Sequence, residues 1–394
     1  MTVTFHRLGV RHDGDEWIVG RVDSGDFVAV PEEGLLAIRL LQQGMDVEQA
    51  RVHLLEETGT DLDVADFVAA LSEAGLVAEV EGHPIPGPAW QRPTFPWLQP
   101  RHVRWTLHPA LHLALLGPIG TGIACLVLRP AIFPGWEAVL WTDHGAAVLL
   151  TWAVVAWLTT GLHELAHLLT ARAASVPARM SLGTRLQFLV AQTDVSGIWV
   201  APTRIRVTVY LAGTAVDLTI SGMALTWVFA IGPNPIVSWV ILIQTLRLAN
   251  QFLVFMRTDL YFLLQDVTGC RNLYGSGAAY VVGLLRGRRN TLASLPPRER
   301  LSVRLYAVLQ SVGTLACLSF AVLVTLPLVV TLIVHSVQDL LGAKEPWAMA
   351  EAVVVLALII IPDLLWARAW WRRHGRRVRR AAATAGSAVR TLSP

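Results

Sequence analysis

The sequence predicts a polytopic α-helical membrane protein, with about six transmembrane helices, that begins with a soluble α/β winged-helix-like domain. Composition is the first observation: of 394 residues, 54% are hydrophobic and 15% are charged, and the mean hydropathy is +0.50. Such a chain is too apolar for a soluble domain of this size. Charge is the second observation. Residues 1–82 hold 17 acidic and 5 basic residues, whereas the remaining 312 hold 12 and 27. This split indicates a solvated acidic domain followed by a membrane body with arginine-rich loops.

The first 83 residues are expected to form the soluble domain. The expected elements are two strands at 16–22 and 26–31, three amphipathic helices at 32–44, 46–59 and 63–75, and a last strand at 76–81. In the helices, apolar residues recur at three- and four-residue spacing and a glycine closes each segment. Asp46 and Asp63 stand where N-caps belong.

A winged-helix order of elements raises the question of DNA binding. A domain with about twelve net negative charges would repel a phosphate backbone, whose capture needs arginine and lysine contacts. We therefore expect no nucleic-acid partner. Instead, "SGDFVAVPEEG", "LLQQGMDVEQ" and "DVADFVAALSEAGLV" resemble the PqqD-like family, or RiPP recognition element, over residues 14–82. The resemblance implies a peptide-binding domain to which the leader of a precursor adds as an extra strand.

A proline-rich segment and six apolar stretches follow. Residues 84–104 are expected to be a stiff linker, 105–371 the transmembrane domain and 372–394 a basic cytoplasmic tail. The expected spans lie near 110–133, 146–170, 207–231, 234–256, 305–334 and 348–370. Because arginines crowd the second and fourth loops between spans and the tail, the positive-inside rule predicts a multi-pass protein of the cell membrane with both termini in the cytoplasm. The lipid bilayer is thus one expected partner.

The string "HELAH" at 163–167 places three ionisable side chains in one of these apolar stretches. On a helix, His163 and His167 project from the same face and can bind one metal ion, while Glu164 is placed to act as a general base on water. Lone histidines are usually structural. Ionisable groups inside a span are expensive and usually functional, which favours the metal hypothesis.

Two histidines leave one protein ligand to be found in the other spans. The candidates are Asp217, Asp259, Asp266 and Asp363. Only Asp259 and Asp266 are expected at the cytoplasmic end of a span, at the depth of the HELAH helix. Asn250 and Gln251, near the same end of the fourth expected span, are candidates for hydrogen bonds either to a substrate or oxyanion, or between helices.

The ordered segments "HELAH", "GTRLQFLVAQTDVSGIWVAPTRIR", "LAGTAVDL" and "RTDLYFLLQDVTGCRNL" resemble the site-2 protease group of intramembrane zinc metalloproteases, in particular its peptide zinc metalloprotease branch, over residues 145–275. By this resemblance, His163 and His167 are zinc ligands and Glu164 is the catalytic base. It also implies that Asp259 is the third zinc ligand and that Asp266 matches a second, supporting aspartate.

Two further features accompany the resemblance. The resemblance implies a β-hairpin at the membrane in the loop at 174–206, where "RLQFLVA" and "SGIWVAP" have strand-like content with "QTD" between them. The alternative is an amphipathic surface loop. The chain departs from the family at Val254 and Leu260, where relatives commonly have proline and glycine. These residues precede and follow the expected third ligand.

The function predicted from the sequence is that of a membrane-embedded zinc metalloendopeptidase, with Zn²⁺ as its cofactor. It would mature a ribosomally made peptide whose leader docks on the N-terminal domain, so that the precursor is the expected substrate and partner. One alternative is a site-2-type protease that cleaves a transmembrane regulator. Another is a non-catalytic membrane scaffold or export partner for a peptide precursor.

Overall fold

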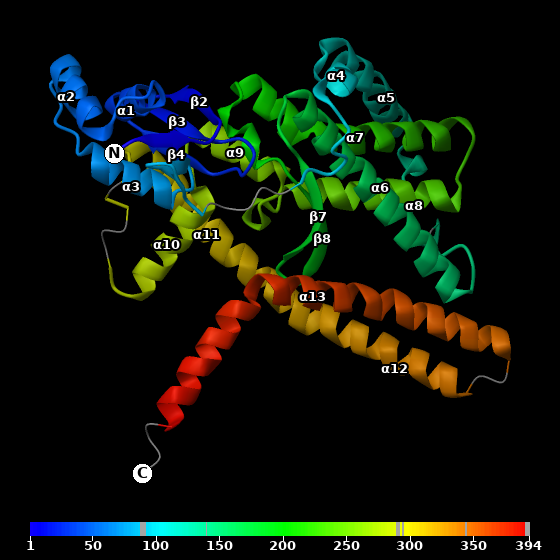
Figure 1. Cartoon of the computed structure of the whole chain (residues 1–394). Coiled ribbons are helices and arrows are strands. Elements are labelled where there is room, and N and C mark those ends of the chain that lie inside the picture. Colours follow the sequence, from blue (N-terminus) through cyan, green and yellow to red (C-terminus); the bar gives the residue numbers. More distant parts are fainter. Residues whose placement is uncertain (87–91, 139, 289–291, 294, 343–344, 391–394) are drawn as a thin grey trace. The chain divides into compact units, whose positions relative to one another are not determined.

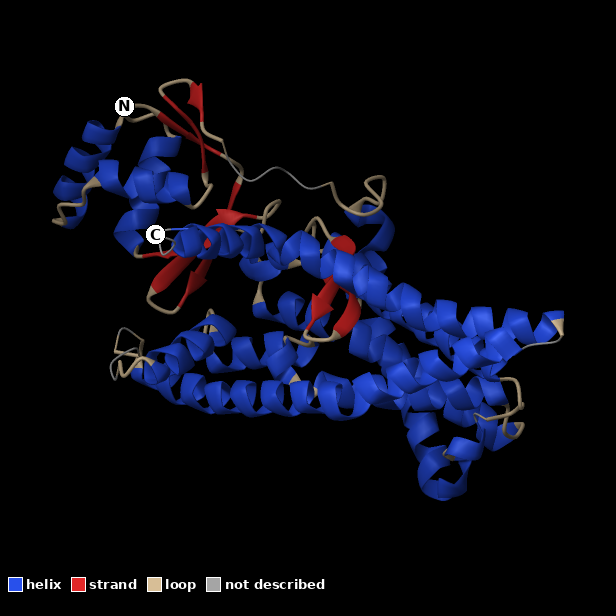
Figure 2. Ribbon diagram, turned by 90° about the horizontal axis from the view of Figure 1, so that it is seen from below, coloured by secondary structure: helices blue, strands red, loops and turns tan. Residues whose placement is uncertain are grey.

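The computed structural model describes the whole chain apart from residues 87–91, 139, 289–291, 294, 343–344 and 391–394 (Figure 1). Helices make up 68% of the structure, and the strands form three small sheets among them (Figure 2). The chain divides into two compact units. The first contains residues 1–111, 165–180 and 193–212, and the second contains 112–164, 181–192 and 213–394.

The N-terminal domain contains the expected strands and helices together with three further strands. Its elements are β1 Val3–Phe5, β2 Leu8–Asp13, β3 Glu16–Arg21, β4 Phe27–Val30, α1 Glu32–Gln42, α2 Val47–Thr58, α3 Val64–Glu73, β5 Val77–Val80 and β6 His83–Pro84. The strands form two antiparallel sheets, in the orders β1-β5-β6 and β2-β3-β4. Strand β2 was not expected because "LGVRHD" is mostly polar, yet all six of its residues pair with β3.

Both expected N-caps of this domain are confirmed. The Asp46 carboxylate accepts hydrogen bonds from the backbone N–H groups of Glu48 and Gln49, each at 2.9 Å, and Gln49 returns the contact to the backbone of Asp46. Asp63 caps α3 in the same way. The apolar faces of the three helices then pack with the strands around a buried core. Its fully buried members include Val19, Leu41, Leu54, Val68 and Leu76.

Within the first unit, the β3–β4 turn packs on the segment that follows the hairpin. A Cβ atom added at Gly197 would lie 2.3 Å from the Val22 carbonyl oxygen, so that only glycine allows this approach. The expected linker makes two hydrogen bonds through Thr94. The Thr94 backbone N–H donates to the Ala178 carbonyl at 3.0 Å, and the Thr94 hydroxyl accepts from the Met180 N–H at 2.9 Å. The linker therefore contacts the start of the hairpin through Thr94; its residues 87–91 lie outside the described part of the chain.

Five helices among the described residues are long and apolar enough to cross a membrane. They are α5 Pro109–Leu128, α6 Gly145–Ala173, α7 Thr203–Ala230, the continuous helix Glu299–Gly342, and the part of α13 at Pro346–Gly375. The fourth of these joins α11 Pro297–Phe320 to α12 Leu326–Gly342 through a π-helical stretch, Ala321–Thr325. The predicted membrane-embedded character is thus supported, with five such helices where six were expected.

The missing candidate is the expected span at 234–256. Helix α8 Pro235–Gln251 has 17 residues and is followed by the short 3-10 helix η5 Val254–Met256 and by α9 Asp259–Thr268. The chain leaves helical geometry at Leu253 and adopts a left-handed conformation at Arg257, with φ of 59°. Among the described residues, α10 Leu273–Leu285 is also apolar but short, and α4 Pro100–Val103 has four residues.

Helices α5 and α7 approach closely through two glycines. A Cβ at Gly122 would lie 2.4 Å from the Gly222 Cα atom, and a Cβ at Gly222 would lie 2.2 Å from the Pro118 carbonyl oxygen. Small residues at such crossings let helix backbones approach within membranes. Any larger side chain at either position would push α5 and α7 apart.

The expected β-hairpin is present, but its strands lie elsewhere than expected. Strand β7 runs over Arg179–Arg185 and β8 over Phe188–Asp194, so the turn falls at Leu186 and Gln187. The segment "SGIWV" forms a 3-10 helix, η4 Ser196–Val200, at whose start the Asp194 carboxylate accepts hydrogen bonds from the backbone N–H and the hydroxyl of Ser196. At the turn, the Trp366 indole N–H donates to the Leu186 carbonyl at 3.0 Å.

Candidate metal centre

Helix α6 carries the HELAH string in its last three turns. His163, Glu164 and His167 are 5%, 8% and 6% exposed, respectively. The two histidines are one helical turn apart on this continuous helix, so their rings share one face. Buried imidazole and carboxylate groups cost free energy unless they are paired or bind a metal, which makes their partners the central question.

Asp259, the first residue of α9, meets His163. One Asp259 carboxylate oxygen, Oδ2, lies 3.1 Å from His163 Nε2. Together, His163, His167 and Asp259 each offer one ligand atom, and these atoms all lie within 4.8 Å of one another. Two imidazoles and one carboxylate, with a fourth position for water or substrate, form a ligand set that suits zinc.

The other ring nitrogens of the two histidines have oxygen partners. His163 Nδ1 lies 2.7 Å from Asp217 Oδ2, and His167 Nδ1 lies 2.8 Å from the Val209 carbonyl oxygen. A carbonyl oxygen only accepts hydrogen bonds, so His167 Nδ1 carries the proton, and the Asp217 carboxylate favours the same tautomer at His163. In both rings Nε2 is then the atom able to bind a metal. Metal-binding histidines usually have this kind of partner, which fixes the tautomer and the ring orientation.

Asp217 on α7 is fully buried, and two residues of α8 accompany it. Gln244 Nε2 donates to Asp217 Oδ1 at 2.9 Å, and Arg247 Nε lies 3.8 Å from the same oxygen. Among the described residues, Asp217 thus contacts His163 rather than contributing an atom to the three-residue group. The sequence placed it too far down the third span to serve as the third ligand, and gave no reason to expect its contact with His163.

A third residue of α8, Gln251, holds Asp259. Its Nε2 donates to Asp259 Oδ2 at 2.9 Å, and its Oε1 accepts from the Asp259 backbone N–H at 3.1 Å. Asn250, predicted together with Gln251, is exposed. Asp266 lies two turns along α9 and Asp363 is exposed on α13; neither belongs to the group of His163, His167 and Asp259.

Positive charge also reaches the site from Arg185, at the end of β7. Burial lowers the pKa of its guanidinium, and the negative charges of Asp259 and Glu164 oppose that shift. The effect of both carboxylates on Arg185 indicates that the three charges are close in space. Sequence reasoning missed Arg185, Gln244 and Arg247. For Gln244 and Arg247 a signal existed, because with Gln251 they recur at helical spacing in an otherwise apolar segment.

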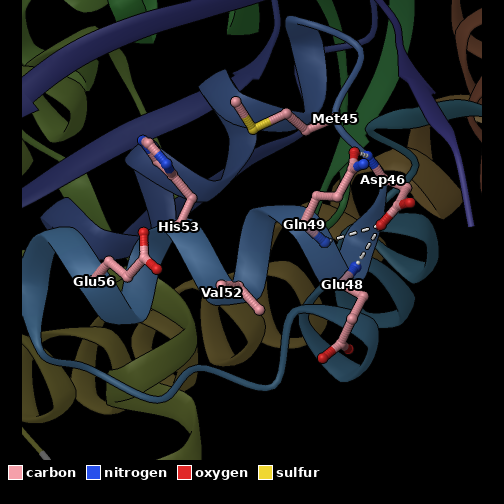
Figure 3. Close-up of a pocket in the computed structure, with 7 residues that line it drawn as sticks. All are labelled: Met45, Asp46, Glu48, Gln49, Val52, His53 and Glu56. Atoms are coloured by element: carbon pink, nitrogen blue, oxygen red, sulfur yellow. Dashed lines mark hydrogen bonds between the residues drawn. The ribbon is translucent and has the colours of Figure 1, made fainter.

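A separate hollow of about 620 Å³ lies on the N-terminal domain, along α2 (Figure 3). It is lined by Met45, Asp46, Glu48, Gln49, Val52, His53 and Glu56. The hydrogen bonds drawn there are those with which Asp46 caps the helix. None of the HELAH residues lines this hollow, and its polar groups are those of a solvated helix end.

The candidate metal centre therefore consists of two buried histidines one turn apart, each with its Nδ1 hydrogen-bonded, and an aspartate whose Oδ2 lies 3.1 Å from His163 Nε2. No protein-family model, curated protein or solved structure matches this chain.

Proposed function

We propose that the protein is a membrane-embedded zinc metalloendopeptidase of the peptide zinc metalloprotease branch of the site-2 protease group. The observation that carries the proposal is the pairing of both Nδ1 atoms, of His163 with Asp217 and of His167 with the Val209 carbonyl. This pairing presents both Nε2 atoms to a metal beside Asp259. A zinc ion held there would polarise the carbonyl of a peptide bond and acidify a water molecule.

The chain's own residues have distinct roles in this mechanism. Glu164 takes a proton from the attacking water on its carboxylate and returns it to the leaving amine. Asp259 would hold the zinc together with the two histidines, and Gln251 keeps the Asp259 carboxylate in place. Burial of His163, Glu164 and His167 excludes bulk water, which strengthens the electrostatic interactions in the site.

In this proposal, the N-terminal domain binds the leader of the precursor substrate. Its sequence resembles the PqqD-like family, whose members bind leader peptides by strand addition. Docking raises the local concentration of a ribosomally made precursor near the protease. The proposed setting is the cell membrane, with both termini in the cytoplasm, as the placement of arginines predicts.

The proposal is tested with the full chain in detergent, loaded with zinc and incubated with a complex mixture of peptides. New peptide termini are then detected by mass spectrometry. Glu164→Gln should abolish cleavage and retain about one zinc per chain, because it removes the base and leaves all three ligands. Glu351→Gln is the matched control, since Glu351 accepts a backbone hydrogen bond that a glutamine also accepts. Cleavage that persists in Glu164→Gln would refute the mechanism.

A non-catalytic scaffold is the second candidate, and one observation favours it. His163 lies between two carboxylates, at 2.7 Å from Asp217 and 3.1 Å from Asp259, as a cationic imidazole would in a structural ion pair. A scaffold of this kind would bind no zinc. The zinc content of the purified wild-type protein therefore separates the two functions.

A further inference from the structure

Helix α8 has a polar face in an apolar sequence. Gln244, Arg247 and Gln251 are spaced by three and four residues, so they line one side of the helix over about 10 Å. Gln244 is completely buried and Gln251 is 7% exposed. Polar groups in such surroundings are costly unless they are hydrogen-bonded, so their partners show what this face does.

Gln244, at the N-terminal end of this face, binds Asp217. Gln244 Nε2 donates both to Asp217 Oδ1 at 2.9 Å and to the Asp217 carbonyl oxygen at 3.3 Å. The amide thus fixes the carboxylate and the backbone of the same residue. Because Asp217 Oδ2 is the partner of His163 Nδ1, this contact also fixes the orientation of the imidazole ring.

Arg247 contacts both Asp217 and helix α6, which carries the histidines. Its NH2 group donates to the hydroxyls of Thr160 at 2.6 Å and Thr159 at 3.1 Å, and its Nε lies 3.8 Å from Asp217 Oδ1. Thr160 precedes His163 by one helical turn on α6. One guanidinium therefore ties α6, α7 and α8 together beside His163.

The last residue of α8 holds the other carboxylate. The Gln251 side chain binds Asp259 at two points, the backbone N–H and Oδ2. The backbone carbonyl oxygen of Gln251 also accepts a hydrogen bond from the Thr258 hydroxyl at 2.7 Å. These contacts bring the two ends of the seven-residue segment between α8 and α9 together. The position of Asp259 therefore depends on where α8 ends.

We infer that α8 is the positioning element of the metal centre: Gln244 and Arg247 hold the carboxylate that orients His163, and Gln251 holds the carboxylate that binds the metal. Both carboxylates are fixed from one face of one helix, so the distance between His163 Nε2 and Asp259 depends on α8. This inference rests on the metal site of the proposed function, and concerns metal binding rather than cleavage.

The test compares zinc affinity in full-length, detergent-purified protein, by competition with a chelator of known affinity. Gln251→Ala and Gln244→Ala should each weaken zinc binding by about 10- to 100-fold, the usual effect of losing a partner of a metal ligand. The double variant should bind zinc more weakly than either single variant, because it releases both carboxylates that contact His163. Asn250→Ala, which removes an exposed amide beside Gln251, is the matched control and should bind like wild type.

Two measurements separate positioning from general damage to the fold. The visible absorption of the cobalt(II)-substituted protein reports ligand geometry, and it should change in Gln251→Ala while thermal unfolding of the metal-free protein stays as in wild type. Gln251→Asn, which keeps an amide but shortens its reach by one methylene, should also weaken binding and covers the case in which Gln251→Ala does not fold.

The outcomes also separate this inference from the proposed function. Zinc affinity that is equal in Gln244→Ala, Gln251→Ala and wild type overturns the role of α8 and leaves the peptidase untouched. The expected loss of affinity, with no cleavage by zinc-loaded wild type, supports the role of α8 and overturns the peptidase. A wild type that binds no zinc overturns both.

Discussion

The contact between Asp217 and His163 can be tested by a substitution that conserves shape. Asp217→Asn replaces two acceptor oxygens by one oxygen and one NH2 group. In the wild type both oxygens are used, because Oδ2 lies 2.7 Å from His163 Nδ1 and Oδ1 accepts from Gln244 Nε2 at 2.9 Å. An asparagine can serve only one of these two donors, so the other donor faces an NH2 group.

Either orientation weakens the site. If the oxygen faces His163, the imidazole keeps a neutral acceptor in place of a charged one, and loses part of a charge-assisted hydrogen bond worth about 1.5–3 kcal/mol. If the NH2 group faces His163, the ring must accept at Nδ1 and carry its proton on Nε2, where a metal would bind. A free-energy change of about 1.4 kcal/mol corresponds to a tenfold change in Kd. The orientation with the oxygen towards His163 therefore predicts a loss of about 10- to 100-fold in zinc affinity, and the orientation with the NH2 group towards His163 predicts a larger loss.

The assay is zinc affinity by chelator competition, with Asp363→Asn as the control. Asp363 is an exposed aspartate on α13, outside the group of His163, His167 and Asp259. The control should bind zinc like wild type. If Asp217→Asn binds zinc within about threefold of wild type, Asp217 does not orient a metal-binding histidine, and the reasoning from the Nδ1 partners fails.

The remaining predictions concern the third ligand and the N-terminal domain. Asp259→Ala should abolish stoichiometric zinc binding, measured by elemental analysis, because two histidines alone complete no zinc site. Gly197→Val should separate the β3–β4 turn from its neighbour, since even a Cβ would lie 2.3 Å from the Val22 carbonyl, and limited proteolysis should then cut the linker faster. Asp46→Ala should destabilise the domain by about 1 kcal/mol in chemical denaturation, through loss of a cap. A hydrogen bond from Arg21 lowers the pKa of Asp23, so this contact stabilises above about pH 4 and is lost as the pH falls through the lowered pKa. Asp23→Asn should therefore melt below wild type at pH 6, with a difference that shrinks towards pH 3.

The parts of the fold that the sequence predicted well are those with local causes. The three helices of the N-terminal domain have an apolar period within their own residues, and Asp46 and Asp63 cap two of them, α2 and α3, as expected. The HELAH helix is similarly local, because a four-residue spacing alone puts both histidines on one face.

The features that the sequence did not predict depend on partners far along the chain. Helix α8 stops at Gln251, whose side chain and carbonyl bind the segment that carries Asp259, and apolar content alone extended the predicted span beyond it. The hairpin turn was displaced because strand propensity does not fix register. Asp217 could be recognised as the partner of His163 only once α7 was seen to place it there.

The geometry of the two histidines favours a metal centre over a structural ion pair. An ion pair needs only His163, which lies between Asp217 and Asp259. It gives no reason for a second buried histidine one turn further on, with its Nδ1 bound to a carbonyl oxygen and its ligand atom within 4.8 Å of the other two. A divalent cation held by both imidazoles and by Asp259 would account for this arrangement.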